Sequence, residues 1–167
     1  MKIKCEINGL VCELPDFLIE FYTDSKLLYC STITKNRAPY VQPTLFVNVS
    51  NKCSIVFLAN SQSLMVKNLY QNKKISLTID KIHPLNPFLN KGIMIEAISQ
   101  INSSKDAIEE ILREFERKYT FEVISKILGI DIVDQCVKIQ ALPRKIIYWE
   151  GPSFHRFKCE KQKLINA

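Results

Sequence analysis

The chain has 167 residues, of which 47% are hydrophobic and 24% are charged. This length suits a single domain that buries a core, and the composition is ordinary for a globular protein. The apolar runs are too short to span a bilayer, and the charged start of the chain does not fit a secretory signal peptide. We therefore expect a cytoplasmic protein that folds as one domain over residues 1–167 and does not bind a membrane.

The formal net charge of +6 raises the question of a nucleic-acid partner. The lysines are scattered, however, and the densest cluster lies in the tail at residues 158–163. A cluster at a chain end is typical of a solvated terminus. Because no basic helix or glycine-bearing RNA motif accompanies the charge, the sequence does not favour nucleic acid as a partner.

The cysteines show no metal-binding pattern. None of the six forms a Cys-x-x-Cys pair, and the chain has only two histidines, so we expect no metal site. Asn8-Gly9 is a strong signal for a two-residue turn, which predicts an N-terminal hairpin over residues 2–13. This register places Cys5 opposite Cys12, at a separation that a disulfide accepts. The alternative is two reduced thiols, which a reducing cytoplasm favours.

The rest of the chain predicts strands joined by short turns, with few helices. Pro15 begins a helix, Ser63 begins a second one, and Ser103 and Thr120 begin the two helices of an insert at residues 103–129. Short connections favour the pairing of consecutive strands and closure into a barrel. From their β-branched and apolar patterns, strands are predicted at residues 26–34, 41–49, 53–58, 74–82, 93–101, 136–142 and 145–150.

One corner of this predicted fold has the features of an anion site. The strand that ends near Ala59 leads through Ser61 into the helix at Ser63, and Lys67 follows one turn later. The first N–H groups of a helix lack internal partners, so a phosphate of a nucleotide could bind there. The alternative interpretation is that Ser63 only caps the helix and Lys67 only faces solvent.

An ordered set of motifs resembles the pyridoxamine 5'-phosphate oxidase-like family of flavin-binding split β-barrels. The resemblance covers about residues 12–157, and it implies a mainly β fold with minor α: a six-stranded antiparallel split β-barrel with flanking helices. The motifs are Cys30-Ser31-Thr32, Pro39 and Pro43, Phe57–Ser63, Lys67-Asn68-Leu69, Ile75–Asp80, Lys91–Ala97 and Pro143–Trp149.

The resemblance implies a homodimer with two cofactor sites at the subunit interface. The cofactor is usually flavin mononucleotide (FMN), and in some branches it is a 5-deazaflavin coenzyme. By position, the residues that line the isoalloxazine ring would be Gln42, Pro43, Thr44, Leu45, Leu58, Ala59, Asn60 and Ser61. Those that face the ribityl phosphate would be Ser63, Lys67 and Asn68. Trp149 would approach the cofactor ring of the partner subunit, although a lone tryptophan in a strand is as often part of a core.

One departure from the family pattern concerns the phosphate. Many members carry an Arg-Lys pair directly after the position of Ser63, where this chain has Leu64-Met65. The cations that remain for this role are Lys67 and, from other segments, Lys35, Arg37 or a partner-chain Arg144. FMN, a 5-deazaflavin coenzyme and no cofactor therefore all stay open.

The sequence favours a flavin- or deazaflavin-dependent oxidoreductase that transfers hydride between the cofactor and a small organic substrate. The cofactor would carry the chemistry, and we assign no catalytic residue because no carboxylate–histidine pair supports one. The alternative is a split-barrel protein that binds flavin or another ligand without turnover, or that holds no cofactor.

Overall fold

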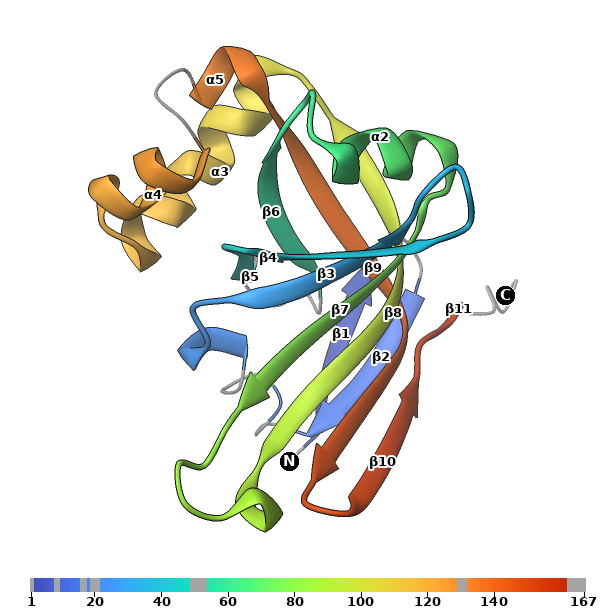
Figure 1. Ribbon diagram of the computed structural model, residues 1–167. Helices are drawn as coiled ribbons and strands as arrows, with labels where there is room; N and C mark the ends of the chain where they lie inside the picture. The colour runs from blue at the N-terminus through green and yellow to red at the C-terminus, as the bar shows by residue number, and fades with distance from the viewer. Residues whose placement is uncertain are drawn as a thin grey trace.

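The computed structural model describes residues 2–7, 10–15, 18, 22–48, 54–128 and 132–161 (Figure 1). Most of these residues belong to antiparallel strands. A small sheet has the order β1-β2-β11, and it consists of β1 (Lys2–Ile7), β2 (Leu10–Pro15) and β11 (Glu160–Lys161). The predicted hairpin register is confirmed, since Cys5 is the direct partner of Cys12. The side chains of these two cysteines lie outside the described residues.

The large sheet has eight strands, and it forms the barrel. Its order is β4-β3-β7-β8-β9-β6-β5, and β10 pairs with the free end of β9. The strands are β3 (Leu28–Ile33), β4 (Pro39–Thr44), β5 (Val47–Asn48), β6 (Ile55–Asn60), β7 (Lys74–Lys81), β8 (Lys91–Asn102), β9 (Cys136–Glu150) and β10 (Ser153–Lys158).

The two edges of this sheet belong to one short piece of chain. β4 and β5 are the edge strands, yet only Leu45 and Phe46 separate them in sequence. The sheet is therefore curled until its edges nearly meet. This is the split barrel that the sequence predicted, but the sheet has eight strands and not the expected six, because β4 and β5 are separate strands and β10 adds to β9. The predicted strand at 41–49 is two strands, because the chain leaves one edge and joins the other at this crossover.

A tyrosine hydroxyl fixes the crossover between the two edges. The Tyr119 hydroxyl lies 2.6 Å from the Phe46 carbonyl oxygen and 2.9 Å from that of Lys26, and it accepts the Phe46 N–H at 3.1 Å. Tyr119 ends the longest helix, so the helical insert holds the edge of the barrel in place.

Several helical segments accompany the sheets in the described part of the chain. α2 crosses one end of the barrel, and α3, α4 and α5 gather beside β6 (Figure 1). None of the described helices is long and apolar enough to cross a membrane. Residues 18 and 22–24 of the helix predicted after Pro15 are helical; the rest of that helix lies outside the described residues. The segments are α2 (Leu64–Gln71), η1 (Pro87–Leu89), α3 (Lys105–Lys118), α4 (Phe121–Leu128) and α5 (Ile132–Gln135).

Side chains of the strands alternate between the barrel interior and an outer face. On β3, Leu28 and Cys30 are fully buried, whereas Tyr29 and Ile33 are 42% and 41% exposed. β7 and β8 alternate in the same way. This period of two follows from the pleat of a strand, and it leaves the outer face of β3, β7 and β8 available to a ligand or partner.

Burial of Cys30 predicts a stability that falls in alkali. The apolar interior raises the pKa of this thiol from 9.0 to about 12, so above pH 9 the unfolded chain loses this proton and the folded chain keeps it. Its contribution is therefore complete below pH 9 and is lost as the pH rises toward 12.

We expect Cys30→Ala to be less stable at pH 7 but to lose less stability between pH 9 and 11 than the wild type does. Urea unfolding at several pH values measures both. Lys118, whose pKa burial lowers to about 8, titrates in both proteins and cancels in the comparison. Parallel pH profiles for the two proteins would contradict this account.

Candidate functional site

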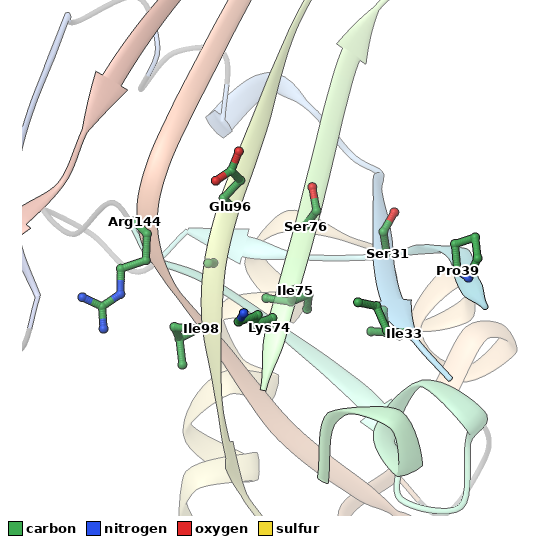
Figure 2. A pocket seen from close by; sticks show the side chains of 11 residues that line it. Ser31, Ile33, Pro39, Lys74, Ile75, Ser76, Glu96, Ile98 and Arg144 are labelled. Atoms are coloured by element: carbon green, nitrogen blue, oxygen red, sulfur yellow. The ribbon is translucent and has the colours of Figure 1, made fainter. Parts of the chain in front are cut away.

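A groove of about 450 Å³ lies on the outer face of the sheet, where β3, β7 and β8 run side by side (Figure 2). Figure 2 shows Ile33 and Pro39 at one side of the groove and Arg144 at the opposite side. The lining residues are Ser31, Thr32, Ile33, Pro39, Lys74, Ile75, Ser76, Glu96, Ala97, Ile98 and Arg144.

The lining of the groove has more positive than negative charge. Lys74 and Arg144 contribute two cations, and Glu96 is the one acid among the lining residues. The Glu96 carboxylate accepts a hydrogen bond of 2.5 Å from the Lys145 ammonium, which balances its charge. Hydroxyl groups of two serines and apolar side chains of two isoleucines face the same space. An excess of cations beside apolar walls suits an organic anion.

Arg144 reaches the groove because the β8–β9 ladder contains a β-bulge. The register pairs Glu96 with Lys145 but Ala97 with Pro143, so Arg144 is an extra residue on β9. Pro143 has no N–H to donate to the ladder, and bulges accommodate such residues and re-aim their neighbours. The sequence predicted two strands joined at Pro143-Arg144; the structure has one strand that continues through the bulge.

Trp149 lines a second hollow of about 440 Å³ on the same outer face, together with side chains that include Phe154 and Arg156. Gly92 lies opposite Trp149 in the β8–β9 register. A Cβ atom on Gly92 would stand 2.1 Å from Cζ2 of the indole, so the ring packs directly on the glycine backbone. Trp149 is therefore not a residue of the barrel interior, and its contact with a cofactor stays a prediction.

The predicted anion corner at α2 uses several of its donors internally. The Ser63 hydroxyl accepts the N–H of Val66 at 3.3 Å, which makes Ser63 the cap of the helix. The Asn60 side-chain oxygen accepts the N–H of Gln62 at 2.8 Å, and the N–H of Ser61 donates to a carbonyl of α5 at 2.8 Å. The helix start thus binds its own chain, as the capping interpretation expected, and offers a phosphate fewer N–H groups than predicted.

The two polar residues in the middle of α2 have different surroundings. Lys67 is exposed, as an anion-binding side chain must be. Asn68 is only 2% exposed, and its amide donates to the Thr32 hydroxyl at 3.0 Å. In the protomer Asn68 therefore braces α2 against β3 instead of facing a ribityl phosphate, because its position on the helix points to the sheet.

Four other predicted residues lie in the barrel interior, so their side chains do not form an open slot in this protomer. Thr44 and Leu45 lie at the inward-facing end of β4 and in the crossover. Leu58 and Ala59 lie on β6, which is buried on both faces, one by the barrel core and the other by the helical insert. Sequence reasoning had given this strand one free face. The four residues are Thr44, Leu45, Leu58 and Ala59, each at most 5% exposed.

The two remaining predicted residues lie on β4. Gln42 is half-buried, and its side-chain oxygen accepts the Tyr40 hydroxyl at 3.0 Å. Pro43 is exposed on the outer face, as is Pro39, which lines the groove.

Sequence reasoning missed the side chains of β7 and β8 as site residues. Their signal was present in the period of two, since Lys74 and Ser76 alternate with buried Ile75 and Leu77. The sequence does not indicate that the outer face of β7 and β8 remains uncovered by other elements. No cluster of three or more His, Cys, Asp or Glu in the described part of the chain could hold a metal ion.

Comparison with known proteins shows that the chain matches the model of one protein family. Residues 14–137, well over half of the chain, match the family model described as Pyridoxamine 5'-phosphate oxidase. A sequence search of curated proteins finds no match.

Solved structures with the same fold differ in what their names say they bind. A heme-binding protein from Mycobacterium smegmatis has a TM-score of 0.65 and 12% identity over 86% of this chain, which spans only 58% of that protein. An F420 reductase has a TM-score of 0.61 and 14% identity, covering 80% of this chain and 98% of that one. An FMN-binding, pyridoxamine 5'-phosphate oxidase-related protein from Nostoc punctiforme has a TM-score of 0.63 and 8% identity, covering 89% and 96%. At these identities the likeness shows the fold alone.

The contact between Trp149 and Gly92 yields a test of the second hollow. We expect Gly92→Ala to displace the indole and to cost about 1–3 kcal/mol, the usual cost of overpacking. Trp149 is the only tryptophan, so a red shift of its fluorescence reports the displacement. In a Trp149→Leu background the same change should cost much less. An equal cost in both backgrounds would show that the ring is not what excludes a side chain at this glycine.

Proposed function

Because the chain belongs to the pyridoxamine 5'-phosphate oxidase family, we propose that it binds FMN or a 5-deazaflavin coenzyme in the groove and is an oxidoreductase. Its substrate would be a small organic molecule, and the protein would act in the cytoplasm. When bound, the cofactor supplies a ring that accepts or donates hydride. The chain's own residues supply binding, orientation and a site with little water.

The observation that carries this proposal is the pair of cations in the groove. A volume of about 450 Å³ lies in the range of small-molecule sites. Lys74 and Arg144 would hold the acidic end of the cofactor through charge-assisted hydrogen bonds. The hydroxyls of Ser31 and Ser76 would bind polar edges, and Ile33 would contact apolar surface.

Lys74 and Arg144 could also replace the Arg-Lys pair that many family members carry where this chain has Leu64-Met65. Both residues belong to α2 and are uncharged; Met65 is fully buried and Leu64 is 47% exposed, so neither offers a charge to a phosphate. The proposal moves that role from the helix start to β7 and β9, with Lys67 as the one exposed cation that α2 adds.

We further propose that two copies of the chain pair through the outer face of the sheet and close the groove. The face exposes large apolar side chains around the groove. Such contiguous apolar patches are rare on monomeric proteins and are typical of interaction surfaces. Among them are Tyr29, Ile33, Val41 and Phe154, at 42%, 41%, 56% and 66% exposed.

A second candidate function is ligand binding without turnover. It is favoured by the lining of the groove, which holds no histidine and a single carboxylate, that of Glu96, which is ion-paired with Lys145. Hydride transfer by the cofactor does not require such a group, so oxidoreductase activity remains the first choice.

Mass spectrometry of the small molecule released on denaturation tests the cofactor directly. We expect FMN or a deazaflavin, together with the matching absorbance bands before denaturation. Bleaching of these bands by a reduced nicotinamide would support an enzyme, and a bound but unreactive cofactor would support the second candidate. Release of heme, or failure to bind any flavin after reconstitution, would refute the proposal.

We expect Arg144→Gln to weaken FMN binding by about ten- to a hundredfold, since it removes a charge-assisted contact worth roughly 1.5–3 kcal/mol. Quenching of flavin fluorescence on titration measures the dissociation constant. Arg117→Gln is the matched control, because Arg117 is an exposed cation at the end of α3 that pairs with Glu114. Equal affinity in the two variants would remove Arg144 from the site.

We expect Val41→Glu to shift the protein from dimer to monomer, because it places a charge in the apolar face that the partner would cover. Light scattering after gel filtration gives the mass. Val123→Glu makes the same change at a position on α4 that is 39% exposed and should leave the dimer intact. A wild-type protein that is monomeric at tens of micromolar would overturn the dimer.

A further inference from the structure

A third hollow, of about 390 Å³, lies on β8 and β9 beyond the bulge. We call it the lysine hollow. It is built from the ends of two neighbouring strands and from the turn between α2 and β7. Its lining residues are Lys73, Gln100, Ile101, Asn102, Lys138 and Gln140.

The lining of the lysine hollow is rich in hydrogen-bond donors. It has two ammonium groups and three side-chain amides, and it contains no carboxylate. The Asn102 side-chain oxygen accepts the N–H of Ser104 at 2.8 Å, so the NH₂ group of Asn102 is left to donate. Such a set of donors matches an anion and does not match a cation.

Lys138 is the most enclosed charge of the hollow, since its side chain is only 17% exposed. Its ammonium donates to the Glu110 carboxylate at 3.2 Å, and Glu110 is 65% exposed at the rim. An exposed acid of this kind contributes little to holding the lysine. With Lys73, the hollow keeps a net positive charge when Glu110 is counted.

The turn that carries Lys73 is fixed in place before any ligand binds. The Lys73 carbonyl oxygen accepts two hydrogen bonds from Ser99, one from the N–H at 2.8 Å and one from the hydroxyl at 3.1 Å. Ser99 is 1% exposed, so this anchor lies in the interior. A preformed site avoids the entropy cost of ordering a loop on binding.

The lysine hollow is a neighbour of the groove on the same sheet face. Lys73 directly precedes Lys74, and Gln100 lies two residues beyond Ile98 on β8. Residues two apart on a strand point to the same face and lie about 7 Å apart. One ligand can therefore reach both places.

We propose that the lysine hollow binds a second acidic group, a phosphate ester or carboxylate, of a ligand whose first acidic group lies in the groove. The inference rests on the proposed function, because that function places a cofactor in the groove. It predicts that the protein prefers a cofactor with two acidic groups to a cofactor with one.

The first experiment tests the hollow without any flavin. Inorganic phosphate is titrated into ¹⁵N-labelled protein, and the side-chain amide signals of Gln100, Asn102 and Gln140 are followed by NMR. We expect saturable shifts in the wild type and their loss in the double variant Lys73→Gln/Lys138→Gln. Lys81→Gln/Lys126→Gln is the matched control, since it removes the same charge from two exposed lysines elsewhere.

The second experiment compares FMN, which has one phosphate, with flavin adenine dinucleotide, which has two. We expect Lys73→Gln/Lys138→Gln to weaken binding of the dinucleotide by about tenfold or more and to leave FMN within about twofold. Arg144→Gln should weaken both flavins. The control double variant should weaken neither.

The outcomes separate the two proposals. Equal losses for the two flavins, or phosphate shifts that survive removal of both lysines, would overturn the role of the hollow while FMN binding stands. If no flavin binds, the proposed function fails and the phosphate titration alone decides the hollow. Salt-sensitive binding of a DNA oligonucleotide that depends on the same two lysines would also overturn a small-molecule site.

Discussion

Pro143 imposes one break on the long β8–β9 ladder, and the outer face of the sheet is organised around that break. Because proline cannot donate to the ladder, β9 carries an extra residue, and Arg144 occupies it at the edge of the groove. On one side of the bulge the ladder holds Trp149 against Gly92, and on the other side it holds Lys138 beside Asn102. The three hollows of this face therefore depend on a single register shift.

A different constraint closes the sheet into a barrel. Its edges meet at the Leu45-Phe46 crossover, which the hydroxyl of Tyr119 binds at the end of the helical insert. Apolar side chains of the described residues fill the interior of the barrel. The cofactor that we propose would therefore bind on the outer face, where the period of two along β3, β7 and β8 decides which side chains could contact it.

The fold was largely readable from the sequence because it depends on local signals. The Asn8-Gly9 signal predicted the hairpin whose register the structure confirms in β1 and β2, and alternating apolar residues predicted most strands. The site was less readable because it depends on which faces remain uncovered. Leu58 and Ala59 lie on a strand that the helical insert buries on its second face, and no short-range pattern announces that packing. Asn68 likewise looked available in sequence, yet its partner Thr32 lies 36 positions away.

The distribution of charge along the outer face gives the strongest physical indication of the kind of ligand involved. A single phosphate needs one localised cluster of cations, and the start of α2 does not provide it, since Met65 is buried and the Ser63 hydroxyl is used by the helix itself. The cations are instead spread from Arg144 through Lys74 to Lys138. Charges at successive positions along a face interact best with a ligand whose acidic groups are also separated. An elongated anion satisfies that spacing with an apolar ring at one end, and a compact one leaves part of the positive charge without a partner.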